Sequence, residues 1–308
     1  MTWIDEQGEK GLVSVIVPVH NRAELVVETL DSIWAQTYRP IELIVVDDGS
    51  TDESLRIVED WAKAVGTAEG FRMSVLAQQQ SGAQVARNRG LKACRGEYIH
   101  LFDSDDIMAP QKLTTQVALL TVCPSIGFVV GDIAFFTHDP AEHVHSVAFS
   151  EREHTGTAHL GAVVLDIGST LYRRHTVALL GPLDEELSAC QDFEYNFRLF
   201  ANGVKGVWLP ECLALIRRHG DSITARRLDR HHESLYQACV KVETTARRHG
   251  MASPQLLDAI GKRVLFYLAV PLRKERQVGL SLRYFVKAWR TMCWRSRLTG
   301  MCHWLLGR

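Results

Sequence analysis

The feature that most constrains the fold is a regular alternation of two kinds of segment through the first hundred residues. Short apolar runs rich in β-branched residues, typical of buried strands, occupy residues 12–19, 41–46, 72–76 and 98–102. Segments with helical spacing of apolar residues separate them, at residues 22–36, 51–65 and 82–93. Strands that alternate with helices form a mostly parallel sheet with helices on both faces. The sequence therefore predicts an α/β fold here.

Beyond residue 106 the alternation weakens. We predict a helix at 110–122, a strand at 128–130, extended segments at 163–172 and 204–217, and a helix at 191–201. From residue 226 onward the pattern is helical and basic, with breaks expected at Pro254 and Pro271. We therefore expect one large α/β domain at residues 1–224 and a basic helical extension at residues 225–308.

Charge is divided unevenly between these two parts, although the whole chain carries a net charge of only −1. Residues 1–224 hold 18 Lys and Arg against 31 Asp and Glu, whereas residues 225–308 hold 17 against 5. The basic end is thus available to phosphates, to anionic lipid or to an acidic neighbour.

Cysteine usage and the first residues bear on the cellular compartment. The seven cysteines form no C-x-x-C pair, and their odd number argues against a fully paired secreted framework. The acidic start of the chain lacks a signal-peptide pattern, and no apolar run approaches the roughly 18–20 residues that span a bilayer. We therefore expect a cytoplasmic protein.

Polar residues follow three of the predicted strands where each strand ends. His20 and Asn21 follow one strand, Asp47 and Asp48 follow another, and DSDD at 103–106 follows the last. Ligands of open parallel sheets gather beyond the carboxyl ends of the strands. Up to five carboxylates along one edge would repel one another without a cation or hydrogen-bond donors. Hard oxygen ligands suit Mg²⁺ or Mn²⁺ attached to a substrate diphosphate.

The segment DGSTD has a simpler interpretation. Asp and Asn after a strand are also routine turn and N-cap residues, and this segment precedes a predicted helix. We therefore favour capping for Ser50 and Asp52. Three acids in the four residues 103–106 exceed what a short turn requires.

Three segments resemble a known family when taken in their order and spacing. SVIVPVHNR, IELIVVDDGSTD and SGAQVARNRGLKACRGEYIHLFDSDD look like the nucleotide-sugar-binding half of the inverting family 2 glycosyltransferases of GT-A fold. The resemblance implies a nucleotide-diphospho-sugar transferase fold, with a Rossmann-like, mostly parallel sheet. It places the donor-binding half at about residues 12–120 and the acceptor half at about residues 121–224.

The resemblance also implies roles for residues of the donor half. Pro18 and His20 would line the nucleoside pocket, and Asp48 would accept a hydrogen bond from the base. Arg87 of ARNRG would reach the base or the diphosphate. The alternative for Arg87 is an exposed helix arginine.

The same resemblance supplies a metal site. Asp103, Ser104 and Asp105 match the D-x-D motif of the family, in which the last Asp binds the metal and the first lies by the ribose or the metal. RRHGDSIT resembles a late family segment in which a histidine joins the metal or diphosphate, which nominates His219. A neutral imidazole is a suitable ligand for Mn²⁺. The alternative for His219 is a surface histidine in a basic turn.

A catalytic base must accept the proton of the acceptor hydroxyl. CQDFEYNFRL resembles the segment in which the family places Glu-Asp at the start of a helix, so Asp192 takes the base position. Gln191 stands where Glu is frequent, which makes the match incomplete. The alternative for Asp192 is a first-turn carboxylate that interacts only with the helix dipole.

Two further segments carry no individual assignment. GSTLYRR, at residues 168–174, looks like the acceptor-side strand and loop of the family. A scattered group of histidines fits no common zinc spacing and is interpreted as loop residues: His138, His143, His145, His154 and His159.

The basic end contains an amphipathic helix pattern at residues 280–298. Its apolar stripe comprises Leu282, Phe285, Val286, Trp289, Met292 and Cys293, and its basic residues are Arg283, Lys287, Arg290 and Arg297. Such a helix suits an anionic membrane surface. The alternative is that the stripe packs on the catalytic domain.

Together these expectations describe a metal-dependent inverting glycosyltransferase. It would move a sugar from a nucleoside diphosphate, which the resemblance suggests is UDP, to a saccharide or lipid-linked saccharide, with Mn²⁺ or Mg²⁺ as cofactor. We expect a role in bacterial surface polysaccharide or glycolipid assembly at the cytosolic face of the membrane, and no nucleic acid partner. The alternatives are a catalytically silent nucleotide-sugar-binding or scaffold protein, suggested by Gln191, and, less favoured, a nucleotidyltransferase.

Overall fold

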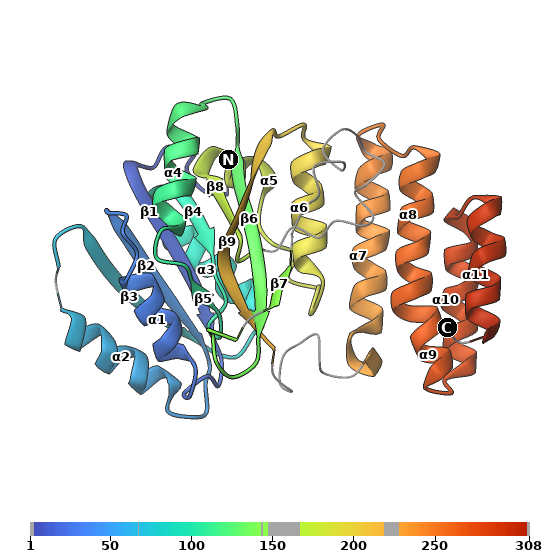
Figure 1. Ribbon diagram of the computed structural model, residues 1–308, viewed down its shortest axis with the longest axis horizontal. Coiled ribbons are helices and arrows are strands. Elements are labelled where there is room, and N and C mark those ends of the chain that lie inside the picture. Colours follow the sequence, from blue (N-terminus) through green and yellow to red (C-terminus); the bar gives the residue numbers. More distant parts are fainter. Residues whose placement is uncertain (1–2, 67, 143, 147–166, 219–227, 307–308) are drawn as a thin grey trace. The chain divides into compact units, whose positions relative to one another are not determined.

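The computed structural model of the chain describes residues 3–66, 68–142, 144–146, 167–218 and 228–306 (Figure 1). The chain divides into two compact units that are interleaved in sequence. The first comprises Met1–Ala148, Leu165–Glu185 and Gly203–His219, and the second comprises Phe149–Val164, Glu186–Asn202 and Gly220–Arg308. The expected domains at 1–224 and 225–308 stay a prediction, because these units are defined by packing and not by activity.

A mixed β-sheet forms the centre of the first unit. Its strands are β1 (Glu9–Val19), β2 (Ile41–Asp48), β3 (Phe71–Gln78), β4 (Gly96–Leu101), β5 (Ile107–Met108), β6 (Phe128–Phe136), β7 (Val144–Ser146), β8 (Thr170–Arg173) and β9 (Gly206–Arg217). They lie in the order β3-β2-β1-β4-β8-β6-β9-β5, and β7 pairs with β6. Strands β1 to β4 are mutually parallel, whereas β8 is antiparallel to both β4 and β6.

Helices of the first unit cover this sheet. They are α1 (Val26–Trp34), α2 (Ser54–Val65), α3 (Ala83–Ala93), α4 (Lys112–Val122) and α5 (Arg174–Leu180). All eight residues of β2 are buried, which requires cover on both faces of the sheet. Gly90 lets α3 approach β1, because a Cβ at this position would overlap the Ile16 side chain. The predicted α/β sheet with helices on both faces is confirmed.

The predicted elements of the first unit are present with shifted ends. Residues 128–130 belong to the longer strand β6, because its partner β9 extends the pairing to Phe136. The short strands β5 and β7 were not predicted, since two or three residues show no periodicity. Of the extended segment expected at 163–172, residues 163–166 lie outside the described part of the chain.

The second unit is helical. Its elements are α6 (Gln191–Ala201), α7 (Leu228–Arg248), α8 (Pro254–Val264), a π-helix (Leu265–Ala269), α9 (Val270–Lys274), α10 (Val278–Thr291) and α11 (Trp294–Leu306). Buried apolar residues from each of α6 to α10 form one core. The expected helix at 191–201 has the predicted bounds, and the expected break at Pro254 is confirmed. Pro254 begins α8, where Ser253 Oγ caps the helix by accepting a hydrogen bond from Leu256 N at 3.2 Å.

The predicted break at Pro271 is wrong. The helix continues from α8 through the π-helix into α9, and Pro271 lies near the start of α9. Val270 N donates to Leu265 O, five residues back, in the pattern of a π-turn. This wider turn accommodates a proline, which has no N–H and would collide with the carbonyl four residues before it in a regular helix.

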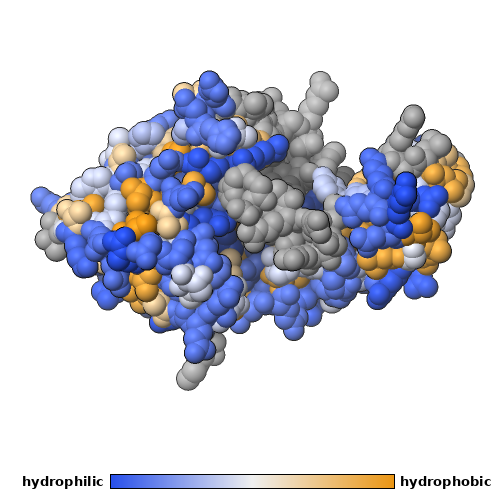
Figure 2. Space-filling view, turned by 90° about the horizontal axis from the view of Figure 1, so that it is seen from below, coloured by the Kyte–Doolittle hydropathy of each residue, from blue (hydrophilic) through white to orange (hydrophobic). Residues whose placement is uncertain are grey.

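The apolar stripe predicted for residues 280–298 is divided between two environments. Met292 is buried, whereas Phe285 and Trp289 are half-buried and form an aromatic pair with ring centroids 5.5 Å apart. Leu282 and Val286 are exposed, and Figure 2 shows orange apolar residues at the surface of the C-terminal helices. None of the helices in the described ranges combines the length and the apolar content needed to cross a bilayer.

Candidate functional site

The sheet order brings three strand ends together. Strands β2, β1 and β4 are parallel neighbours, so their carboxyl ends meet at one edge. Val19 pairs with Asp47, and Phe102 N donates to Ile16 O at 3.0 Å. The residues that follow these strands therefore gather at one edge of the sheet, as the sequence predicts.

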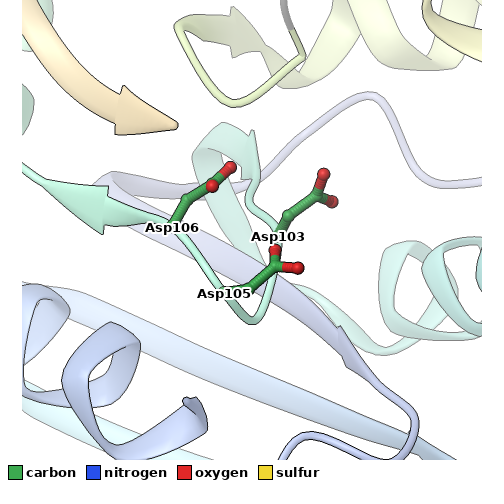
Figure 3. A group of neighbouring side chains, drawn as sticks. All are labelled: Asp103, Asp105 and Asp106. Carbon is green, nitrogen blue, oxygen red and sulfur yellow. The ribbon is translucent and has the colours of Figure 1, made fainter. Parts of the chain in front are cut away.

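The loop after β4 carries a cluster of three carboxylates (Figure 3). Ligand oxygens of Asp103, Asp105 and Asp106 all lie within 4.8 Å of one another. Within the described ranges, this is the one group of three or more His, Cys, Asp or Glu side chains close enough to share an ion. Carboxylate oxygens at this spacing match the ligand preference of Mg²⁺ and Mn²⁺. Asp106 was not among the predicted ligands, although its place in DSDD was a usable signal.

Each carboxylate of this acidic loop has a cationic or hydrogen-bonding neighbour. Arg87 Nη2 donates to Asp103 Oδ1 in a very short contact. Arg22 Nε donates to Asp105 Oδ2 at 3.2 Å, with both side chains largely buried. These donors offset the repulsion among the three acids, so that the loop can form without an added charge.

Arg87 is buried, with only 3% of its side chain exposed. Its Nε and Nη1 are buried and have no hydrogen-bond partner among the described residues. The alternative interpretation of Arg87, an exposed helix arginine, is therefore wrong. Leaving buried guanidinium N–H groups without an acceptor costs free energy. The contact of Arg87 with the base or the diphosphate stays a prediction.

Arg217, at the end of β9, ties a distant strand to the acidic loop. Its backbone N donates to Asp106 Oδ1 at 2.9 Å and its Nε donates to the Asp105 carbonyl at 3.0 Å. The guanidinium also pairs with Glu28 and lies over the Phe136 ring, 4.4 Å from the centroid. Sequence reasoning missed this residue, although it lies in the RRHGDSIT segment that was singled out.

Asp48 organises the loop that precedes α3. Its Oδ1 accepts hydrogen bonds from Gln78 Nε2 and Ser81 N, both at 2.8 Å, and its Oδ2 accepts one from Gly82 N at 2.7 Å. A carboxylate offers about four acceptor positions, so Oδ2 keeps capacity for one more donor. The predicted contact with a nucleoside base is compatible with this geometry and stays a prediction.

His20 contacts the backbone of Asp48. Its Nδ1 is 2.9 Å from the Asp48 carbonyl, which can only accept, so Nδ1 carries the proton. His20 Nε2 is then the acceptor in the neutral ring, and Gln80 Nε2 lies 3.0 Å from it. Pro18 is buried in β1 opposite Val46, and Ser104 is buried within the acidic loop. Their roles in the nucleoside pocket are untested.

The capping interpretation of DGSTD is confirmed for Asp52 but not for Ser50. Asp52 Oδ1 accepts from Ser54 N at 2.9 Å, at the first residue of α2, and Oδ2 accepts from Ala23 N at 3.2 Å. Burial alone would raise the pKa of Asp52, but hydrogen bonds from Ser54 and Ala23 outweigh it and lower the pKa. Ser50 Oγ accepts from Asn21 N at 3.1 Å. These residues hold the loop and are not part of the carboxylate cluster.

The predicted base and third ligand belong to other parts of the chain. Asp192 is the second residue of α6 in the second unit, is half-buried, and accepts a hydrogen bond from Phe193 N at 2.8 Å. Gln191 Oε1 is buried beside it without a partner in the described ranges. His219 lies outside the described residues. Both assignments remain predictions.

The scattered histidines are only partly described. His138 lies in an exposed loop, as predicted, whereas His145 belongs to β7, so the loop assignment is wrong for His145. His143, His154 and His159 lie outside the described residues. His138 joins no metal-ligating group among the described residues.

The chain is similar in sequence to known glycosyltransferases. The model of Glycosyl transferase family 2 matches residues 14–175. EpsJ of Bacillus subtilis, described as an uncharacterized glycosyltransferase, is 31% identical over 239 residues, which cover 74% of this chain and 68% of EpsJ. Glycosyltransferase GlyG of Streptococcus pneumoniae is 41% identical over 105 residues, which cover 34% of this chain and only 33% of GlyG.

Solved structures resemble the fold over nearly the whole chain. S. aureus TarS 1-349 in complex with UDP-GlcNAc has a TM-score of 0.63 at 18% identity, covering 96% of this chain and 92% of that one. The mannosyltransferase PcManGT from Pyrobaculum calidifontis, in complex with GDP-Man and Mn²⁺, has a TM-score of 0.58 at 20% identity, covering 95% and 86%. These likenesses confirm the predicted GT-A fold.

Proposed function

The chain belongs to glycosyl transferase family 2, and from that membership we propose a metal-dependent inverting enzyme that transfers a sugar from a nucleoside diphosphate to an acceptor hydroxyl. The observation that carries the proposal is the cluster of Asp103, Asp105 and Asp106 at the edge where three parallel strands end. The ligands named for TarS and PcManGT support a nucleotide-sugar donor. We propose UDP as the nucleotide.

Mn²⁺ or Mg²⁺ would be held by Asp105 and Asp103, with His219 as a further ligand. When bound, the metal neutralises charge on the departing diphosphate. Asp106 would keep its backbone hydrogen bond and orient the loop. Nε and Nη1 of Arg87, which have no hydrogen-bond partner among the described residues, would donate to diphosphate oxygens. Asp48 and His20 would position the nucleoside.

The reaction also requires a group that activates the acceptor hydroxyl. Asp192 would accept the proton of the acceptor hydroxyl while the hydroxyl oxygen attacks the anomeric carbon and the bond to the diphosphate breaks. The attack comes from the face opposite the leaving group, so the anomeric configuration inverts. Asp192 lies in the first turn of α6, where a carboxylate interacts favourably with the helix dipole.

For the acceptor we propose a saccharide or lipid-linked saccharide of bacterial surface polysaccharide or glycolipid assembly, at the cytosolic face of the membrane. The family resemblance and the bacterial sources of the relatives support this assignment.

The test measures donor hydrolysis and transfer from UDP-sugars with Mn²⁺ and with a chelator. Asp192→Asn is expected to lower kcat by roughly 100-fold or more with donor affinity unchanged, because it removes only the proton acceptor. Asp60→Asn, an exposed carboxylate on α2, is the matched control and should leave kcat unchanged. Wild-type turnover in Asp192→Asn would reject the base assignment. Nucleotide-sugar binding without any wild-type turnover would favour a catalytically silent protein.

A further inference from the structure

The last 33 residues of the chain have an extreme charge composition. After Glu275 they contain seven Lys and Arg and no Asp or Glu. Helices α10 and α11 occupy most of this segment. Any surface formed by these two helices is therefore positively charged, whatever its apolar content.

The two helices lie side by side and are joined by a polar and aromatic seam. Trp304 Nε1 donates to Ser281 Oγ at 2.7 Å, and the rings of Trp304 and Phe285 have centroids 4.7 Å apart. Arg297 Nε donates to the Trp289 carbonyl at 2.8 Å. We call these contacts between α10 and α11 the seam. The sides of the two helices that face the seam are occupied, so only their other sides can make further contacts.

Each helix buries one side and leaves an apolar row exposed on the other. In α10 the exposed row is Val278, Leu282 and Val286, spaced by four residues. In α11 it is Leu298, Met301 and Leu305, spaced by three and four. Residues at these spacings share one side of a helix. The opposite sides are the buried ones, at Ser281, Tyr284 and Ala288 of α10 and at Ser296 and Gly300 of α11.

The two rows flank the seam on one side and form a single surface, which we call the C-terminal apolar face. Phe285 lies three residues after Leu282, and Trp304 lies three residues after Met301, so each seam ring borders the row of its own helix. In the described part of the chain, eight of the ten most exposed large apolar residues lie between Phe266 and Leu305. An exposed apolar patch of this kind marks an interaction surface.

Basic residues border this face. Arg283 and Arg290 are exposed on α10. Arg283 directly follows Leu282, and Arg290 lies four residues after Val286. Arg295 is exposed on α11. Two copies of the face would bring like charges together, which opposes self-association. An anionic phospholipid surface accepts the apolar side chains and attracts the arginines at the same time.

We propose that the C-terminal apolar face binds the surface of an anionic phospholipid bilayer, with α10 and α11 lying in the plane of the interface. The apolar rows would enter the boundary between headgroups and acyl chains, and Arg283, Arg290 and Arg295 would contact lipid phosphates. The inference goes beyond the catalytic proposal, because it depends on no residue of the nucleotide or metal site.

The experiment is co-sedimentation of the full chain with vesicles of phosphatidylcholine alone and with about 30% phosphatidylglycerol. The wild-type chain is expected to bind the anionic vesicles and to leave them when salt is raised from about 0.1 to about 0.5 M. Arg283→Gln with Arg290→Gln should weaken binding roughly 30-fold. Leu282→Ser with Val286→Ser should weaken it about tenfold or more.

Two controls each carry a single substitution of the same kind elsewhere in the chain. Arg248→Gln removes an exposed charge from the end of α7, and Leu179→Ser removes an exposed apolar residue from α5, so both should bind vesicles like the wild type. UDP affinity, measured on each preparation by calorimetry, should be unchanged in all variants, which separates this proposal from the catalytic one. Equal binding to neutral and anionic vesicles, or none to either, would overturn the proposal. So would concentration-dependent self-association that Leu282→Ser with Val286→Ser abolishes.

Discussion

The acidic loop and the C-terminal helices each concentrate charges of one sign. Charges of the loop are paired with partly or fully buried arginines, whereas most arginines of the helices are exposed. In the loop, Arg87 pairs with Asp103 and Arg22 with Asp105. In the helices, Arg283 and Arg290 are exposed and no acidic residue follows Glu275 in the sequence. Charges held by buried partners define a geometry, whereas exposed charges act through the potential at a surface.

Charged groups are buried in both units, so it is exposure that distinguishes the C-terminal arginines. In the first unit, His100 and Lys112 are buried, and each contacts one backbone carbonyl at 2.9 Å, that of Thr170 and that of Ser169 respectively. The second unit buries Glu194, Asp258 and Arg263 beside its apolar core. Changes of buried charge should therefore alter stability and function, whereas changes of exposed charge on the C-terminal helices should alter partner binding.

The largest expected effect is that of Asp105→Asn on sugar transfer. Removing the carboxylate that the D-x-D resemblance assigns to the metal should lower metal-dependent turnover by roughly 10²–10³-fold, because stabilisation of the leaving diphosphate is lost. Steady-state kinetics at saturating Mn²⁺ check this. Arg290→Gln should turn over a soluble acceptor at the wild-type rate. An equal loss of turnover in Asp105→Asn and Arg290→Gln would contradict the proposed difference between the two regions.

Arg217→Ala tests whether a residue that only positions the acidic loop matters. Loss of its contacts with the Asp105 carbonyl and Glu28 should loosen the loop and raise the Mn²⁺ Kd about 10- to 100-fold. Calorimetric titration of Mn²⁺ into the nucleotide-bound protein measures this. Arg218→Ala is the neighbouring control, because its guanidinium lies over Phe135 and outside the loop. Similar Kd values for the two variants would show that Arg217 has no positioning role.

The smallest effect concerns stability against pH in the first unit. Burial, and then the charge of Lys112, lower the pKa of His100 well below its ordinary value of 6.5. Below a pH of about 6.5, His100 binds a proton in the unfolded chain but stays neutral in the folded protein. The free energy of unfolding should therefore fall as the pH falls. The slope is at most about 1.4 kcal/mol per pH unit.

His100→Gln should reduce this slope between pH of about 6.5 and 5.5, measured by urea unfolding at several pH values. The control is His249→Gln, which changes an exposed histidine after α7 and should leave the slope unchanged. A slope that persists in His100→Gln would assign the acid sensitivity to other groups.

Much of this protein was predictable from local sequence. The alternation of strands and helices, the bounds of α6 and the capping by Asp52 follow from periodicity and from short-range hydrogen bonds. The gathering of His20, Asp48 and the DSDD loop also followed, because parallel neighbouring strands end at the same edge.

Other features depend on residues far apart in the chain. Arg217 reaches Asp105 across 112 positions, and its strand β9 pairs with β6, which no local pattern indicates. The burial of Arg87 was not predicted, because it depends on surrounding side chains. The continuation of the helix through Pro271 was mispredicted, since a π-turn overrides local preference.

The sequence by itself determined the family, the order of strands and helices, and the acids from which a metal site is built. The tertiary structure alone decided which acids come within reach of one ion, which arginines neutralise them, and which apolar residues of the C-terminal helices stay exposed. The physical reason is that periodicity and capping act over a few residues. Burial and charge pairing depend on the packing of segments that are distant in the chain.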